Sequence, residues 1–315
     1  MATDQAIDSK SRMWIIGAAL LALFLGAMDA LIMSAAMPTI VGELGGMHLY
    51  AWVYSTYFLS RAVSLPIFGK LADLFETKKL FLFSIGLFVL SSIAAGASPS
   101  MGFLVVSRVF QGIGAGGNFA LVYIVLADVA PPGKRAQTIS LASSIWGIAS
   151  VLGPTLGGFI VSYFSWRWIF FINIPLGILS LIGIGLFLVE TRQKRRDVYL
   201  DFAGVATLSG LILGLLTIFI VGGRELAWTS PELIMLIAVT LAFGMGFYIS
   251  EKRARDPILD LAFFRNRGFA CGNAAVFLSS FAIFSLFAYA PLFIQGALGK
   301  SPLQVGVAML SLSLG

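Results

Sequence analysis

The chain has 315 residues, of which 58% are apolar and only 11% charged. Soluble globular proteins carry about 25% charged residues, so this composition excludes a surface that is water-exposed all round. The single cysteine, Cys271, excludes an intrachain disulfide, and the single histidine, His48, leaves no histidine–cysteine metal cluster. The formal net charge of +6 could indicate a nucleic-acid partner, so the positions of the charges decide between partners.

Nine mostly apolar stretches are long enough to cross a bilayer as helices, which takes about 20 residues each. In chain order they are 13–40, 50–69, 79–97, 102–127, 137–162, 168–189, 203–222, 232–250 and 269–297, and a tenth begins near Leu303. Turn-forming segments such as "GELGGMH" and "APPGKR" separate them. The first stretch is too long for a signal peptide and carries Asp29 in its interior. We therefore expect an all-α polytopic membrane protein.

The lysines and arginines of the loops predict the orientation of the chain. If the N-terminus is cytoplasmic, sixteen of the 21 lie in segments on the inner side and three, Arg167, Arg224 and Lys300, lie outside. Positive residues favour the cytoplasmic face, so the N-terminus is predicted to be inside the cell. This distribution explains the basic charge without a nucleic-acid partner.

Three charged residues fall inside predicted spans: Asp29, Arg61 and Arg108. Charges at membrane depth are costly and usually face a cavity or a partner, so each one indicates function. Helical spacing puts Arg108 on one face with Gln111, and that face is expected to line a water-filled cavity. Two interpretations stay open for Asp29: a structural ion pair with an arginine, or a carboxylate that binds and releases a proton as the cavity changes sides.

The fifth span, "SSIWGIASVLGPTLGGFIV", combines small residues with a proline. Small faces let membrane helices approach closely, and an internal proline removes one backbone hydrogen bond. The run G-x(5)-G-P-x-x-G-G is more specific than a single G-x-x-x-G. Its members are Gly147, Gly153, Pro154, Gly157 and Gly158.

The stretch "RVFQGIGAGGN" has the G-x-G-x-x-G form of a dinucleotide-binding turn. Such a turn needs a strand before it and an acidic residue about 20 positions further on, and both are missing. The glycines lie within one apolar span, and Gly112 and Gly116, four residues apart, predict a close-packed helix face.

Several motifs together resemble the major facilitator superfamily, in particular its fourteen-helix drug:proton antiporters. "SRVFQGIGAG" is similar to a span-4 signature, "MDALIMSAAMP" to a span-1 signature, and the fifth span to the antiporter signature. "GKLADLFETKK" resembles the loop signature between spans 2 and 3. "WRWIFFINIPLG", "LDFAG", "FFRNRGF" and "PLFIQGALGKSP" resemble the same branch, so the likeness extends through nearly the whole chain.

The resemblance implies roles for particular residues. Arg108 is implicated in proton coupling, and Asp29 is kept from the span-1 signature, while Leu31 and Ser34 depart from it. The resemblance also implies a cytoplasmic gate. Its residues are Gly69, Asp73 and Lys78 of the loop signature, with Asp128 as their acidic partner. Glu76 and Thr77 replace the glycine and arginine that the signature has, and Lys78 or Lys79 is expected to substitute for the arginine.

The resemblance also implies a domain organisation. Residues 1–190 are expected to form a six-helix bundle, 191–202 a basic cytoplasmic linker, 203–250 an inserted helix pair, and 251–315 a cytoplasmic loop and the start of a second bundle. Fourteen helices need over 400 residues at about 30 per span and loop, so we interpret the sequence as a fragment. Transport by alternating access needs both halves of such a protein.

The function that follows is proton-coupled export of amphipathic or cationic small molecules across the cell membrane, driven by the proton gradient without a cofactor or metal. Asp29 would bind the proton, and Arg108 and Gln111 would tune how tightly it is bound. The residues that could line an apolar cavity are Met33, Tyr54, Tyr57 and Trp146. The alternative is export of a defined metabolite such as a siderophore, lipid or sugar, which an Arg61 facing the cavity would favour for an anionic group. A membrane enzyme or receptor is a minor alternative, and mixed charges disfavour a channel. The expected partners are the substrate, protons and the bilayer.

Overall fold

A computed structural model describes residues 8–189, 201–223, 225–255, 257–259, 261–301, 304–305 and 307–309. Most of the predicted linker 191–202 and of the tenth stretch, together with Arg224, lies outside these residues. In this part of the chain the helices are α1 (Ser9–Leu44), η1 (Met47–Leu49), α2 (Tyr50–Leu74), α3 (Thr77–Gly96), α4 (Met101–Val129), α5 (Arg135–Tyr163), α6 (Trp168–Phe171), α7 (Asn173–Phe187), α8 (Phe202–Val221), α9 (Pro231–Arg253), η2 (Leu261–Arg265) and α10 (Arg267–Gly296).

Each of the nine predicted stretches is helical in the structure. Seven helical segments are long and apolar enough to cross a membrane, among the described residues: α1, α3, α4, α5, α6 with α7, α8 and α9. α2 carries Arg61, Lys70 and Asp73 in addition to its apolar residues. The fold is all-helical, and the described part contains one isolated bridge between Gly222 and Leu226. The predicted number of spans and the cytoplasmic N-terminus stay predictions.

The sixth predicted span is broken in two at Ile172, which the sequence reading did not anticipate. Pro175 has no backbone N–H to offer the carbonyl of Phe171, four residues earlier, and its ring crowds that carbonyl. α6 ends at Phe171, the residue at which this conflict falls.

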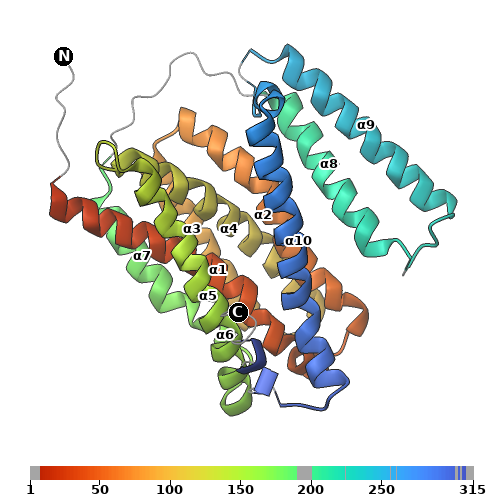
Figure 1. The fold of residues 1–315 in the computed structure, drawn as a ribbon. Helices are drawn as coiled ribbons and strands as arrows, with labels where there is room; N and C mark the ends of the chain where they lie inside the picture. The colour runs from red at the N-terminus through yellow and green to blue at the C-terminus, as the bar shows by residue number, and fades with distance from the viewer. Residues whose placement is uncertain are drawn as a thin grey trace, which may run out of the picture.

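α1 is the central helix of the bundle formed by α1 to α7. It packs against α4, α5 and α7, and its residues from Ala22 to Met37 are almost entirely buried. α2 and α3 in turn pack against α4. α8 and α9 lie side by side next to this bundle, where α8 contacts α2, and α10 passes in front of the bundle (Figure 1).

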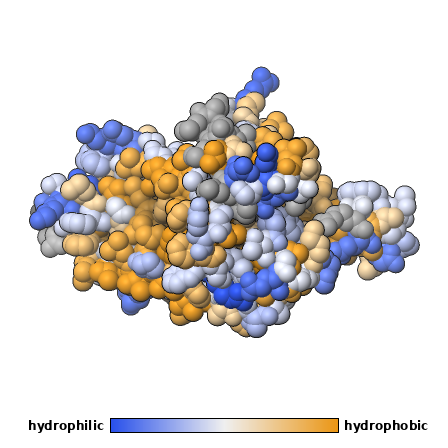
Figure 2. Space-filling model, turned by 90° about the horizontal axis from the view of Figure 1, so that it is seen from below, coloured by the Kyte–Doolittle hydropathy of each residue, from blue (hydrophilic) through white to orange (hydrophobic). Residues whose placement is uncertain are grey.

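The outside of the molecule is apolar, unlike that of a soluble protein. Figure 2 shows wide apolar areas on the face seen from below, with hydrophilic side chains between them and at the margins. Individual residues such as Leu90, Leu186 and Phe219 are exposed by two thirds or more. A surface of this kind suits hydrocarbon chains, whereas two of the largest fully buried side chains, Arg108 and Tyr57, carry polar groups.

Candidate functional site

α1 positions Asp29 in the middle of the bundle. The helix is apolar on all sides around this residue, so burial against its neighbours carries the carboxylate into the core with no exposed surface. A buried carboxylate needs hydrogen-bond donors or a positive partner, because an isolated one costs many kcal/mol. The structure supplies both.

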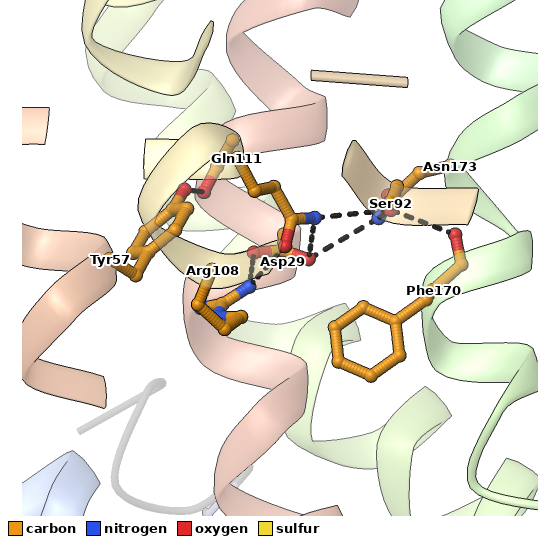
Figure 3. Close-up of polar contacts among 8 residues, drawn as sticks. Asp29, Tyr57, Ser92, Arg108, Gln111, Phe170 and Asn173 are labelled. Carbon is orange, nitrogen blue, oxygen red and sulfur yellow. Dashed lines mark hydrogen bonds and ion pairs between the residues drawn. The ribbon is translucent and has the colours of Figure 1, made fainter. Parts of the chain in front are cut away.

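Arg108 and Gln111 of α4 provide the main partners of Asp29 (Figure 3). Arg108 Nη1 donates to Asp29 Oδ2 at 2.5 Å and to Gln111 Oε1 at 2.7 Å. Gln111 Nε2 donates to Asp29 Oδ1 at 2.8 Å. The spacing of three residues on α4 places both side chains on one face, as predicted, and all three residues are fully buried. The predicted water-filled cavity does not lie at this face of α4: the face packs against α1 and α3.

A second ring of polar groups surrounds the pair, and sequence reasoning missed it. Asn173 Nδ2 lies 3.3 Å from Asp29 Oδ1 and 2.9 Å from Ser92 Oγ. Ser92 accepts from Gln111 at 3.1 Å and donates to the carbonyl of Phe170 at 3.1 Å. Asn173 stands in the quoted motif "WRWIFFINIPLG" as the one amide in that apolar run, which is the signal that could have found it. Nothing in the sequence marks Ser92.

Tyr57 of α2 closes the other side of the network. The Arg108 guanidinium lies over its ring, 4.0 Å from the centroid, and the Tyr57 hydroxyl donates to the carbonyl of Gly26 at 3.0 Å. A cation over an aromatic face is attracted to it, more so away from water. Five helices, α1, α2, α3, α4 and α7, thus contribute to one network, which we call the Asp29 network: Asp29, Tyr57, Ser92, Arg108, Gln111 and Asn173.

The Asp29 network still has unused hydrogen-bonding capacity. Arg108 Nε and Nη2 and Asn173 Oδ1 are buried and have no hydrogen-bond partner. Buried polar atoms are nearly always paired, so orphaned ones mark a site that holds strain or exchanges partners. The ion pair that the sequence left as one of two interpretations is present, and its unpaired donors are compatible with the other interpretation too.

Arg61 lies apart from the Asp29 pair. Its guanidinium lies 4.8 Å from the ring centroid of Phe119 and 5.2 Å from that of Trp146. These three side chains, with Phe58 and Ser280, line a cavity of about 460 Å³. Of the four residues expected to line an apolar cavity, Trp146 does so, whereas Met33 and Tyr57 are fully buried in helix packing.

The glycines of α5 make its close contact with α1. A methyl group on Gly157 would lie 2.7 Å from the carbonyl oxygen of Ile32, and one on Gly153 would lie 2.9 Å from Leu31 Cβ. Pro154 and Gly158 are buried beside them. Gly147 differs, because a methyl group there would meet nothing within 4 Å. The motif therefore lies on α5 as one segment, with its close approach to α1 in the second half.

The glycines of α4 also allow neighbouring helices to approach closely. A methyl group on Gly114 would lie 2.7 Å from the backbone nitrogen of Phe88 on α3, and one on Gly112 or Gly116 would collide with the backbone of α2. α4 runs unbroken through "RVFQGIGAGGN". The G-x-G-x-x-G order packs helices together and forms no nucleotide turn.

The four predicted gate residues lie at one set of helix ends. Gly69 and Asp73 are near the end of α2, Lys78 is at the start of α3, and Asp128 is near the end of α4. Lys79 pairs with Glu76 at 3.0 Å, the residue that replaces the glycine of the signature. The role of these residues as a gate stays a prediction.

Comparisons with known proteins agree with this architecture. The family described as Major Facilitator Superfamily matches residues 19–315. Multidrug resistance protein 3 of Bacillus subtilis is 33% identical over 315 residues, covering 100% of this chain and 61% of the relative. Multidrug transporter protein MdtP of the same organism is 35% identical over 302 residues, covering 96% and 56%. The chain thus spans less than two thirds of the length of these relatives.

Two solved structures share the fold. The human organic anion transporter MFSD10 (TETRAN) superposes with a TM-score of 0.57 at 18% identity, covering 96% of this chain and 70% of that one. A bacterial homologue of the human lysosomal transporter Spinster superposes with a TM-score of 0.52 at 14% identity, covering 96% and 59%. At such identities the likeness concerns the fold alone.

Proposed function

Because this chain belongs to the major facilitator superfamily and its named relatives are multidrug transporters, we propose that the protein is a proton-coupled exporter of amphipathic, drug-like small molecules. The observation that carries the proposal is the Asp29 network, a carboxylate held at the centre of the bundle by an arginine and two amides. Transport is by alternating access of two halves about a site near the midplane, energised by the proton gradient without a cofactor.

In the proposed cycle Asp29 is the proton carrier. With Asp29 ionised, Arg108 and Gln111 hold it as in the structure. Uptake of a proton removes its charge, so Arg108 loses its ionic partner and keeps only the acceptor on Gln111 and the ring of Tyr57. The pair reforms when the proton leaves on the other side. Each exchange repacks five helices, which couples protonation to the conformation of the bundle.

The membrane arrangement is part of the same proposal. The N-terminus lies in the cytoplasm and the protein spans the cell membrane, α1 to α7 form one six-span bundle, and α8 with α9 form an inserted pair. The four predicted gate residues, Gly69, Asp73, Lys78 and Asp128, then lie on the cytoplasmic side, where a gate would close the inward-facing state.

Everted membrane vesicles carrying the full-length protein test the proposal. Two dansyl probes of opposite charge, dansylglycine and dansylethylenediamine, report uptake when the vesicle interior is acidified. We expect gradient-driven uptake of at least one probe, abolished by a protonophore and by Asp29→Asn. Uptake by neither probe, or full uptake by Asp29→Asn, contradicts the proposal.

Export of a defined metabolite is the second candidate, and one observation favours it. Arg61 faces a cavity, where a single fixed positive charge suits a substrate of particular chemistry.

A further inference from the structure

Arg61 is a positive charge within a helix of the bundle, and its surroundings are aromatic. Phe58 lies on the same helix, Phe119 on α4 and Trp146 on α5. Among the described residues, the structure gives Arg61 no ion pair with a carboxylate. Cations at membrane depth are rare, and they pair or face a cavity when they occur. Arg61 faces a cavity.

The two rings fix the guanidinium without neutralising it. The ring planes of Phe119 and Trp146 meet at an angle of 66°, with ring centroids 6.5 Å apart. The guanidinium carbon lies 4.8 Å from the first centroid and 5.2 Å from the second. Attraction to the ring faces holds the guanidinium in place and does not use the hydrogen-bonding capacity of its N–H groups. These N–H groups match the two oxygens of a carboxylate or sulfonate.

The cavity is large enough for a small amphipathic molecule. Its volume of about 460 Å³ lies within the range of ligand pockets, and most of its lining is aromatic. An aromatic ring of a ligand can stack in the same box while its acidic group reaches the guanidinium. Ser280 of α10 adds a hydroxyl group to the lining.

On the basis of the function proposed above, we infer that Arg61, Phe119 and Trp146 form a subsite that selects substrates carrying an aromatic ring and an anionic group. The pocket makes the charge of the substrate, rather than its hydrophobicity alone, the basis of selection.

Tyr57 connects this subsite with the proton site. It lies one helical turn before Arg61 on α2, and its ring lies under Arg108. An anion bound to Arg61 therefore lies one helical turn from a residue that contacts the partner of Asp29.

Equilibrium binding to the purified full-length protein tests the inference separately from transport. Dansylglycine and dansylethylenediamine carry the same fluorophore with opposite charges. We expect the wild type to bind dansylglycine more tightly. Arg61→Gln should weaken that binding roughly 10- to 100-fold, the effect of losing a charge-assisted hydrogen bond, and leave dansylethylenediamine within about twofold.

Further variants keep the result interpretable. Arg61→Lys should recover part of the affinity, since it keeps the charge and loses the planar fork. Arg61→Glu should reverse the preference towards dansylethylenediamine. Lys252→Gln is the matched control, because Lys252 also lies over an aromatic ring, that of Tyr248 on α9, away from the cavity, and its removal should change neither affinity. A wild type that prefers the cation, or an Arg61→Gln variant that weakens both probes equally, overturns the inference.

Failure of the inference can be told apart from failure of the proposed function. Gradient-driven uptake of both probes with no effect of Arg61→Gln removes the subsite and leaves proton-coupled export intact. Charge-selective binding without gradient-driven uptake of either probe removes proton-coupled export and leaves the subsite intact.

Discussion

Asp29 and Arg108 are 79 positions apart in the chain, yet their side chains lie 2.5 Å apart with no part of either exposed. The desolvation of two charges can exceed their attraction, so a buried pair is poor evidence for stability by itself. Here the pair is shared among Gln111, Ser92 and Asn173, and it leaves arginine nitrogens unpaired. Unpaired buried nitrogens mark a site that holds strain or exchanges partners, so the pair is compatible with both interpretations of Asp29.

Removing one partner of the pair should be more damaging than removing both. Asp29→Asn leaves Arg108 charged and buried, and an arginine cannot lose its proton, so we expect the free energy of unfolding to fall by about 3–5 kcal/mol. Arg108→Gln should cost less, because Asp29 can take up a proton. The double variant should be more stable than Asp29→Asn. Denaturant titration in detergent micelles measures all three, and additive losses would show that the two charges are not coupled.

The glycines of the α5 motif should differ in their tolerance of alanine. A methyl group on Gly157 presses on the backbone of Ile32, so Gly157→Ala should lower the free energy of unfolding by about 1–3 kcal/mol. Gly147→Ala is the control in the same motif and should change it by less than about 0.5 kcal/mol, because nothing lies within 4 Å. Equal losses at both positions would contradict the packing described for α5.

Glu43 and Trp166 form a contact at the end of α1 opposite its start at Ser9. Trp166 Nε1 donates to Glu43 Oε2 at 2.8 Å, and Arg167 pairs with the other oxygen. Since Glu43 and Arg167 are partly exposed, Glu43→Gln should cost less than about 1 kcal/mol. Trp166 is buried, so Trp166→Ala should cost about 3–5 kcal/mol. The same denaturant titration compares them, and a larger loss from Glu43→Gln would place the stabilising energy in the ion pair.

The orientation of the chain can be tested with two introduced cysteines. In a Cys271→Ser background, Ala97→Cys lies between α3 and α4 and Lys134→Cys lies between α4 and α5, and both positions are exposed. A membrane-impermeant maleimide should label Ala97→Cys in intact cells and Lys134→Cys only after permeabilisation. The opposite pattern would place the N-terminus outside.

The positions of the helices could be predicted from the sequence because the apolar stretches are long and the turns between them are marked. Asp29 and Arg108 could be identified because charge is conspicuous in an apolar span, and Gln111 because helical spacing puts it on the face of Arg108. Ser92 could not, since a serine at membrane depth often bonds its own helix and only tertiary packing brings it to Gln111. Arg61 could be identified by its charge, but its pairing with Phe119 could not, because its aromatic partners come from α4 and α5.

The break at Ile172 was also missed, although Pro175 carries the signal for it. The proline disturbs the backbone carbonyl four residues earlier, and the length of an apolar stretch carries no information about that carbonyl. That break matters for the site, because Phe170 and Asn173 lie on either side of it and both hold Ser92.

Proton release on substrate binding tests the central claim, that Asp29 carries the proton exchanged for substrate. The measurement follows the pH of a weakly buffered detergent solution of the full-length protein as dansylglycine is added, over a series of starting pH values. We predict release of protons by the wild type and none by Asp29→Asn, with Lys252→Gln unchanged. Equal release by the wild type and by Asp29→Asn, both binding the probe, would contradict the account.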